Sequence, residues 1–189
     1  LLKLILGILQ PAAGRIQLLG ESPLRARARV GYVPQQIDFD PLFPISTLDV
    51  VLMGCLSRGS LGFRPRKDLE LAMHALEQMG LTHKAKSPFA SLSGGQRQAV
   101  LIARALAGQA EILLLDEPTA HVDVAAEQRL MESLKALEAQ LTLITVSHDL
   151  AFVSRSVPKV VCVNRCLHVH PTQELTDARI RELYGRDVR

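Results

Sequence analysis

Two neighbouring carboxylates follow a short apolar run and could do phosphate chemistry. Residues 112–115 are four consecutive apolar residues, which predict a buried strand, and Asp116 and Glu117 come directly after them. Open α/β sheets bind ligands at the carboxyl ends of their strands, so both acids fall where a ligand would bind. One carboxylate there could hold Mg²⁺, and its neighbour could polarise a water for attack on a phosphate. Taken alone, the motif could also be a solvated acidic turn.

A second motif, Ser93-Gly94-Gly95-Gln96, has the form of a helix start. Ser93 is a favourable N-cap, and Gln96 completes a capping box three residues later. Glycine in a helix costs about 1 kcal/mol relative to alanine, so two glycines here indicate that something approaches the backbone closely. Bare N–H groups at the positive end of a helix favour an anion. A capped helix with a flexible entry is the alternative.

The elements that position these motifs follow from the hydrophobic pattern. Apolar runs at residues 30–34, 112–115 and 141–146 predict strands, and helices are predicted at 96–107 and 125–139. This alternation predicts a parallel sheet with helices on both faces.

Other segments have weaker patterns. Prolines and glycines break residues 38–106 into short pieces, clearest as helices at 47–55 and 67–79, so we expect a mostly helical insert. Further expected elements are the end of a buried helix at 1–9, a strand at 15–19 and a hairpin at 160–169 that turns at 164–165.

Composition restricts the class of protein. An apolar fraction of 48% argues against disorder, and no apolar stretch reaches the length of about 18 residues that spans a bilayer. The net charge of +3 comes from scattered basic residues, and there is no Trp, so no nucleic-acid partner is expected. Three cysteines, an odd number, favour a reducing compartment over a disulfide framework.

Five short motifs occur in an order that resembles the ATP-binding cassette ATPases. In that family they would be the Q-loop, signature motif, Walker B motif, D-loop and H-loop. They lie at residues 31–35 (GYVPQ), 92–96 (LSGGQ), 115–119 (LDEPT), 122–123 (VD) and 147–149 (SHD). The resemblance covers essentially the whole chain. It implies an α/β P-loop NTPase (RecA-like) core over residues 1–167, with a helical subdomain at about 38–106 and a C-terminal tail at 168–189.

The resemblance implies roles for the residues of one ATP site. Asp116 would organise the Mg²⁺ shell, with Gln35 near the metal and the attacking water. Glu117 would be the general base that positions this water, and His148 would contact the γ-phosphate. These roles fit a reaction that needs positioning and charge neutralisation more than covalent chemistry.

The signature motif would serve a second subunit. By the resemblance, Ser93, Gly94, Gly95 and Gln96 would bind ATP held by a facing copy, and Asp123 would cross the interface. The implied cofactors are therefore ATP and Mg²⁺, and the implied assembly is a homodimer.

One family motif is missing from these residues. The phosphate-binding loop Gly-x-x-x-x-Gly-Lys-Ser/Thr does not occur among them. In the family, that loop runs into a helix that reads much like residues 1–4, so we expect the chain to begin just after it, with the preceding strands missing too. Because the loop lysine is a main charge partner of the phosphates, these residues alone are expected to bind ATP poorly and to be inactive.

The transported substrate is indicated only by one segment. Residues 38–54 resemble the branch of the family that serves zinc and manganese importers. There the segment after the Q-loop helps to form a groove for a membrane permease, which Phe39, Phe43, Met53 and Phe63 could line; the alternative is that they are core. The implied setting is peripheral, on the cytoplasmic face of the inner (plasma) membrane, with an extracytoplasmic metal-binding protein as an indirect partner.

Other functions stay open. The chain could serve another importer, of a metal chelate or other solute, or it could be a non-catalytic remnant. A soluble ATPase of this type acting on chromosomes or ribosomes is a further alternative. Sustained heptads would favour the chromosome type and a second cassette the ribosome type, whereas this chain has one copy of each motif and no sustained heptads.

Cysteine and histidine residues cluster in the predicted hairpin. Cys162, Cys166, His168 and His170 are all types that bind zinc. A two-residue turn at 164–165 would put Cys162 opposite Leu167, on the other face from the remaining three. Ordinary hairpin residues are therefore favoured over a metal site.

Overall fold

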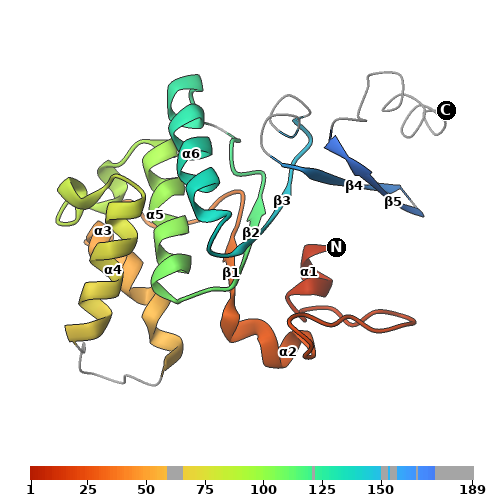
Figure 1. Cartoon of the computed structure of the whole chain (residues 1–189). Coiled ribbons are helices and arrows are strands. Elements are labelled where there is room, and N and C mark those ends of the chain that lie inside the picture. Colours follow the sequence, from red (N-terminus) through yellow and green to blue (C-terminus); the bar gives the residue numbers. More distant parts are fainter. Residues whose placement is uncertain (59–65, 121, 150–152, 154–156, 165, 173–189) are drawn as a thin grey trace. The chain divides into compact units, whose positions relative to one another are not determined.

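The computed structural model describes residues 1–58, 66–120, 122–149, 153, 157–164 and 166–172 (Figure 1). These residues form two compact units, Leu1–Val146 and Ser147–Arg189. Each unit is described by itself below. None of the helices in the described ranges is both long and apolar enough to cross a membrane.

The first unit is built on a parallel sheet of three strands. Its strands are β1 (Val30–Val33), β2 (Ile112–Asp116) and β3 (Thr142–Val146), in the order β1-β2-β3. The central strand β2 is buried from Ile112 to Leu115, as expected for a strand with neighbours on both sides. The three predicted strands and their parallel arrangement are confirmed.

Between β1 and β2, the described residues form three α-helices, and Figure 1 shows them on one side of the sheet. They are α3 (Thr47–Leu52), α4 (Arg66–Gln78) and α5 (Gly94–Ala107), with a 3-10 segment at Met53–Arg58 after α3. The three helices pack against one another, and α5 also packs on β1. The predicted helical insert is confirmed as a group of helices, although α3 is shorter than predicted because its end tightens into the 3-10 segment.

A backbone contact joins two of these helical segments. A Cβ atom added at Gly54 would lie 1.9 Å from the main-chain oxygen of Arg104 in α5. No side chain fits there, so Gly54 is required by the close approach of two backbones.

Helix α6 (Val124–Leu137) connects β2 to β3 and contacts α5. Its buried face consists of Leu130, Leu134 and Leu137, which recur at helical spacing. These leucines belong to the same apolar core as Val100 of α5 and Leu115 of β2. Helices α5 and α6 and strand β2, which carry the predicted motifs of this unit, thus share one core.

The first thirty residues depart from prediction. Only α1 (Leu2–Ile5) is helical in the first nine residues, and it buries no side chain, so the expected buried helix is wrong. The expected strand at 15–19 is reduced to one bridge between Leu18 and Glu21. The segment continues through α2 (Pro23–Ala26) and a 3-10 turn at Arg27–Arg29.

A salt bridge fixes the entry into the sheet. Arg29 Nη2 donates to Glu111 Oε2 at 2.7 Å, and the Glu111 N–H donates to the Arg29 carbonyl oxygen at 2.8 Å. The hydrogen bond from Arg29 lowers the pKa of Glu111. These contacts align the starts of β1 and β2, because both residues lie directly before their strands.

The second unit contains an antiparallel hairpin whose register differs from the predicted one. Strands β4 (Lys159–Asn164) and β5 (Cys166–Pro171) pair Asn164 with Cys166 and Cys162 with His168. Directly paired residues share a face of the ribbon, so Cys162 and His168 lie on the same face, contrary to the prediction. The cause is a register shift of one residue, which moves every cross-strand partner.

The corrected register does not create a metal centre in the described part of the chain. Cys162 is a buried free thiol, and the rings of His168 and His170 stack with centroids 6.3 Å apart. Among the residues that the structure describes, no group of three His, Cys, Asp or Glu side chains could hold a metal ion.

Candidate functional site

The carboxyl end of β2 carries the predicted acidic pair. Because the strands are parallel, Asp116 pairs with Val146 at the end of β3, and Leu115 pairs with Val33 at the end of β1. The loop that carries Gln35 therefore leaves the sheet at the same edge as Asp116 and Glu117.

Glu117 occupies an unusual backbone conformation. Its φ of 47° is left-handed, and its N–H donates to the Val146 carbonyl oxygen at 2.8 Å. A non-glycine residue in this region is uncommon and is often found at functional sites. The chain turns sharply here, between the partly exposed side chains of Asp116 and Glu117 and the buried Pro118.

Tyr32 contacts Asp116, which sequence reasoning missed. The Tyr32 hydroxyl of β1 donates to Asp116 Oδ2 at 3.1 Å. Burial raises the pKa of Tyr32, and the hydrogen bond and charge of Asp116 add to that rise. The sequence does show a tyrosine in the strand predicted at residues 30–34. Its contact with Asp116 could be recognised only once the register of β1 and β2 was known.

The donors at this edge suit Mg²⁺. Tyr32 engages Oδ2 of Asp116, which leaves Oδ1 for another ligand. Magnesium is usually held by one or two carboxylates together with waters and substrate phosphates, rather than by a cage of protein ligands. Asp116 as the single carboxylate, with Gln35 as the predicted second ligand, would fit that pattern.

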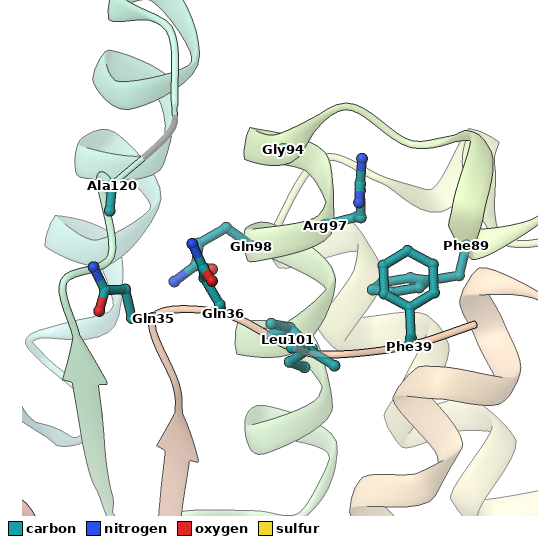
Figure 2. A pocket seen from close by; sticks show the side chains of 10 residues that line it. Gln35, Gln36, Phe39, Phe89, Gly94, Arg97, Gln98, Leu101 and Ala120 are labelled. Atoms are coloured by element: carbon teal, nitrogen blue, oxygen red, sulfur yellow. The ribbon is translucent and has the colours of Figure 1, made fainter. Parts of the chain in front are cut away.

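Gln35 lies beside a cavity of about 440 Å³. It is exposed, two residues after β1, and shares the cavity lining with Gly94 and Gln98 of α5 and with Ala120 (Figure 2). The structure thus brings the Q-loop residue together with the first residue of α5 and with the segment that follows Glu117. Gln98 had not been singled out from the sequence.

The predicted capping box at the start of α5 is confirmed. The Gln96 N–H donates to Ser93 Oγ at 3.3 Å, and the Ser93 N–H donates to Gln96 Oε1 at 3.1 Å. Ser93 and Gly94 are both exposed, so the N-terminal turn is open to a ligand.

Gly95 has a structural reason to be glycine. A Cβ added there would lie 2.7 Å from the Cβ of Ala126 in α6. The sequence interpretation ascribed both glycines to the approach of a ligand, whereas at Gly95 the packing of α5 on α6 is sufficient. On this side, Ser93, Gly95 and Gln96 line a second cavity of about 580 Å³.

Asp123 is the N-cap of α6. Its Oδ1 accepts a hydrogen bond from the Ala126 N–H at 2.8 Å. Asp123 was also predicted to contact a second subunit. The cap holds its backbone in place at the start of α6.

We expect Asp123→Ala to lower the free energy of unfolding by about 1 kcal/mol, since an N-cap contributes that much. Asp123→Asn should restore most of the loss, because its amide oxygen can still accept the bond. Urea unfolding of both variants beside the wild type measures this. Equal losses in the two variants would contradict the capping role.

Four residues that were predicted for the ATP site or for the docking groove are not joined to this site by the structure. His148 is exposed and follows β3 by two residues, in the second unit, so its proximity to Glu117 stays a prediction. Phe43 and Met53 are exposed by 61% and 46%, as a docking groove would need. Phe63 lies outside the described residues.

Phe39 differs from the other candidate groove residues. Its ring packs edge-on against Phe89 with centroids 5.2 Å apart, and the Arg97 guanidinium lies 5.4 Å from its ring centroid (Figure 2). It is partly buried against the main core, which favours the packing alternative for this residue.

Comparison with known proteins gives a consistent family match. A family model described as "ABC transporter" matches residues 1–120. The manganese transport system ATP-binding protein MntB of Bacillus subtilis is 46% identical over 98% of this chain and 76% of its own length. The zinc import ATP-binding protein ZnuC of Pseudomonas fluorescens is 36% identical over 100% of this chain and 67% of its own.

Solved structures agree with the fold. An ABC transporter described as of metal-chelate type, in an inward-facing conformation, superposes with a TM-score of 0.86 at 34% identity and covers 97% of this chain and 72% of its own. A bacterial ABC transporter cassette with a dimeric structure has a TM-score of 0.69 at 27% identity, over 85% and 73% of the two chains.

Proposed function

Since the chain belongs to the ABC transporter family, we propose that it is the ATP-hydrolysing subunit of an importer of divalent metal ions, zinc or manganese. The observation that carries the ATP-hydrolysis part of this proposal is the edge where Asp116 and Glu117 follow β2, next to the strand that leads into the Gln35 loop. Family members couple ATP hydrolysis to transport, and ATP is the nucleotide implied for this chain.

In the proposed reaction, each residue has one task. Asp116 and Gln35 would hold Mg²⁺, which would neutralise phosphate charge. Glu117 accepts the proton of the attacking water, and its left-handed backbone supports this role because it turns the chain at the end of the strand. His148 contacts the γ-phosphate and stabilises the charge that develops there.

The signature motif is proposed to complete the site of a second subunit. Ser93, Gly94, Gly95 and Gln96 offer the positive end of α5 to the γ-phosphate of a facing copy. The exposure of Ser93 and Gly94 supports this, as does the dimeric structure of a relative. Asp123 would meet the facing copy.

The import of a metal ion rests on the named relatives. MntB and ZnuC are described as manganese transport and zinc import proteins. The proposed partners are an integral membrane permease and, indirectly, an extracytoplasmic metal-binding protein. The subunit would then sit peripherally on the cytoplasmic face of the inner (plasma) membrane, with a cassette domain over residues 1–167, a helical subdomain at about 38–106 and a tail at 168–189.

A transport assay tests the proposal. The full-length protein, assembled with its permease in vesicles, is expected to hydrolyse ATP and to accumulate manganese or zinc only when ATP is present. Nickel and an iron chelate serve as competing substrates. ATP-driven uptake of the chelate without uptake of either ion would contradict the metal assignment, and absence of hydrolysis would contradict the ATPase assignment.

A further inference from the structure

The cavity in Figure 2 is lined by a buried side chain that has no role in the proposed function. Gln98 belongs to α5 and is only 7% exposed. Its Nε2 atom is fully buried and has no hydrogen-bond partner among the residues that the structure describes. An unpaired buried amide destabilises a fold, so stability alone does not explain a glutamine at this position.

The surroundings of Gln98 indicate where a partner would come from. The same cavity is lined by Gln35 and Gln36 of the loop after β1, and Gln98 projects from α5 toward that loop (Figure 2). Both loop residues are exposed, so neither is held in place by the apolar core.

The neighbouring polar residue of α5 is already held elsewhere. Arg97 Nε donates to the Leu92 carbonyl oxygen at 3.0 Å, and its guanidinium lies over the Phe39 ring. Arg97 is therefore held on the side of the cavity where Phe39 and Phe89 lie (Figure 2). Gln98 faces the loop, and its Nε2 atom is a hydrogen-bond donor without an acceptor among the described residues.

We propose that Gln98 is a positioning residue for Gln35. When MgATP binds, the loop closes over the cavity, and Gln98 Nε2 donates a hydrogen bond to a main-chain carbonyl oxygen of residue 35 or 36. The side-chain oxygen of Gln35 then stays available for the metal and the attacking water. This inference rests on the proposed function, because it assumes that Gln35 takes part in ATP hydrolysis.

The bond would also connect two motifs. Gln98 stands one turn after the signature residues on the same helix, so closure of the loop and the orientation of α5 would depend on one another. A contact shifts a conformational equilibrium only if it differs between the two states, and a donor that is unpaired in one state and paired in the other meets that condition. One such bond changes the equilibrium about tenfold.

Gln98→Met tests the proposal in the full-length protein. Methionine has a similar length and no donor, so the fold should be unchanged or more stable. We expect kcat for ATP hydrolysis to fall about tenfold with little change in KM, while the melting temperature stays the same or rises. Gln128→Met makes the same change on the exposed surface of α6 and should alter neither quantity.

A double substitution separates positioning from a general structural effect. If Gln98 acts through Gln35, adding Gln98→Met to Gln35→Ala should lower kcat no further. Wild-type kcat in Gln98→Met, an additive loss in the double variant, or a fall in melting temperature that accompanies the loss of kcat would each overturn the inference. These results leave the proposed function intact, whereas a wild-type protein that hydrolyses no ATP would overturn both.

Discussion

Glu117→Gln is expected to keep ATP binding and to lose ATP turnover by about 100-fold or more. The amide preserves the shape of the side chain at the end of β2 but cannot accept the proton of the attacking water. A positioned general base contributes typically 10²–10⁴ in rate, which sets the size of the loss. The measurement is steady-state phosphate release, beside a binding titration with MgATP, in the full-length protein.

The matched control for this variant is Glu138→Gln. Glu138 is exposed just after the end of α6 and belongs to neither cavity described above, so its change should leave turnover at the wild-type rate. If Glu117→Gln also retains near-normal turnover, Glu117 is not the base, and the left-handed turn has another purpose.

Gly54→Ala is expected to cause the largest loss of stability. The added methyl group would lie 1.9 Å from the main-chain oxygen of Arg104, and a backbone atom in α5 cannot move aside as the end of a side chain could. Overpacking of this kind costs about 3 kcal/mol, the upper end of its usual range. For a chain of this size that corresponds to a fall in melting temperature of about 6–12 °C.

Gly20→Ala provides the comparison. Gly20 has a positive φ of 80° but nothing within 4 Å of an added Cβ, so only backbone strain is introduced. That strain costs about 1–2 kcal/mol, which predicts a smaller fall in melting temperature. Equal losses in the two variants would show that the contact between Gly54 and Arg104 relaxes without cost.

The parts of the structure that sequence reasoning predicted well depend on local pattern. Residues 112–115 are apolar without interruption, so a buried central strand was recognisable before its neighbours were known. The capping box of Ser93 and Gln96 lies within a single turn, where residue type and spacing determine the hydrogen bonds.

The parts that it missed depend on contacts between distant residues. Gln98 is a polar residue near a helix start, which by itself suggests an exposed side chain. Its side chain is instead buried, in the wall of the cavity that it shares with residues 35 and 36. The bond from Tyr32 to Asp116 spans 84 positions and needs the strand register. In the hairpin, a one-residue error in the predicted turn was enough to separate Cys162 and His168 onto opposite faces, whereas they pair directly and share a face.

The contact between Gly95 and Ala126 also affects how natural variation in this protein should be understood. Glycine at position 95 is required by the packing of α5 on α6, whatever its role toward a nucleotide. A lineage that carries a larger residue at 126 cannot relax position 95, whereas one with glycine at 126 gains room there. Substitutions at these two positions should therefore be correlated through evolution, even where the nucleotide chemistry itself is unchanged.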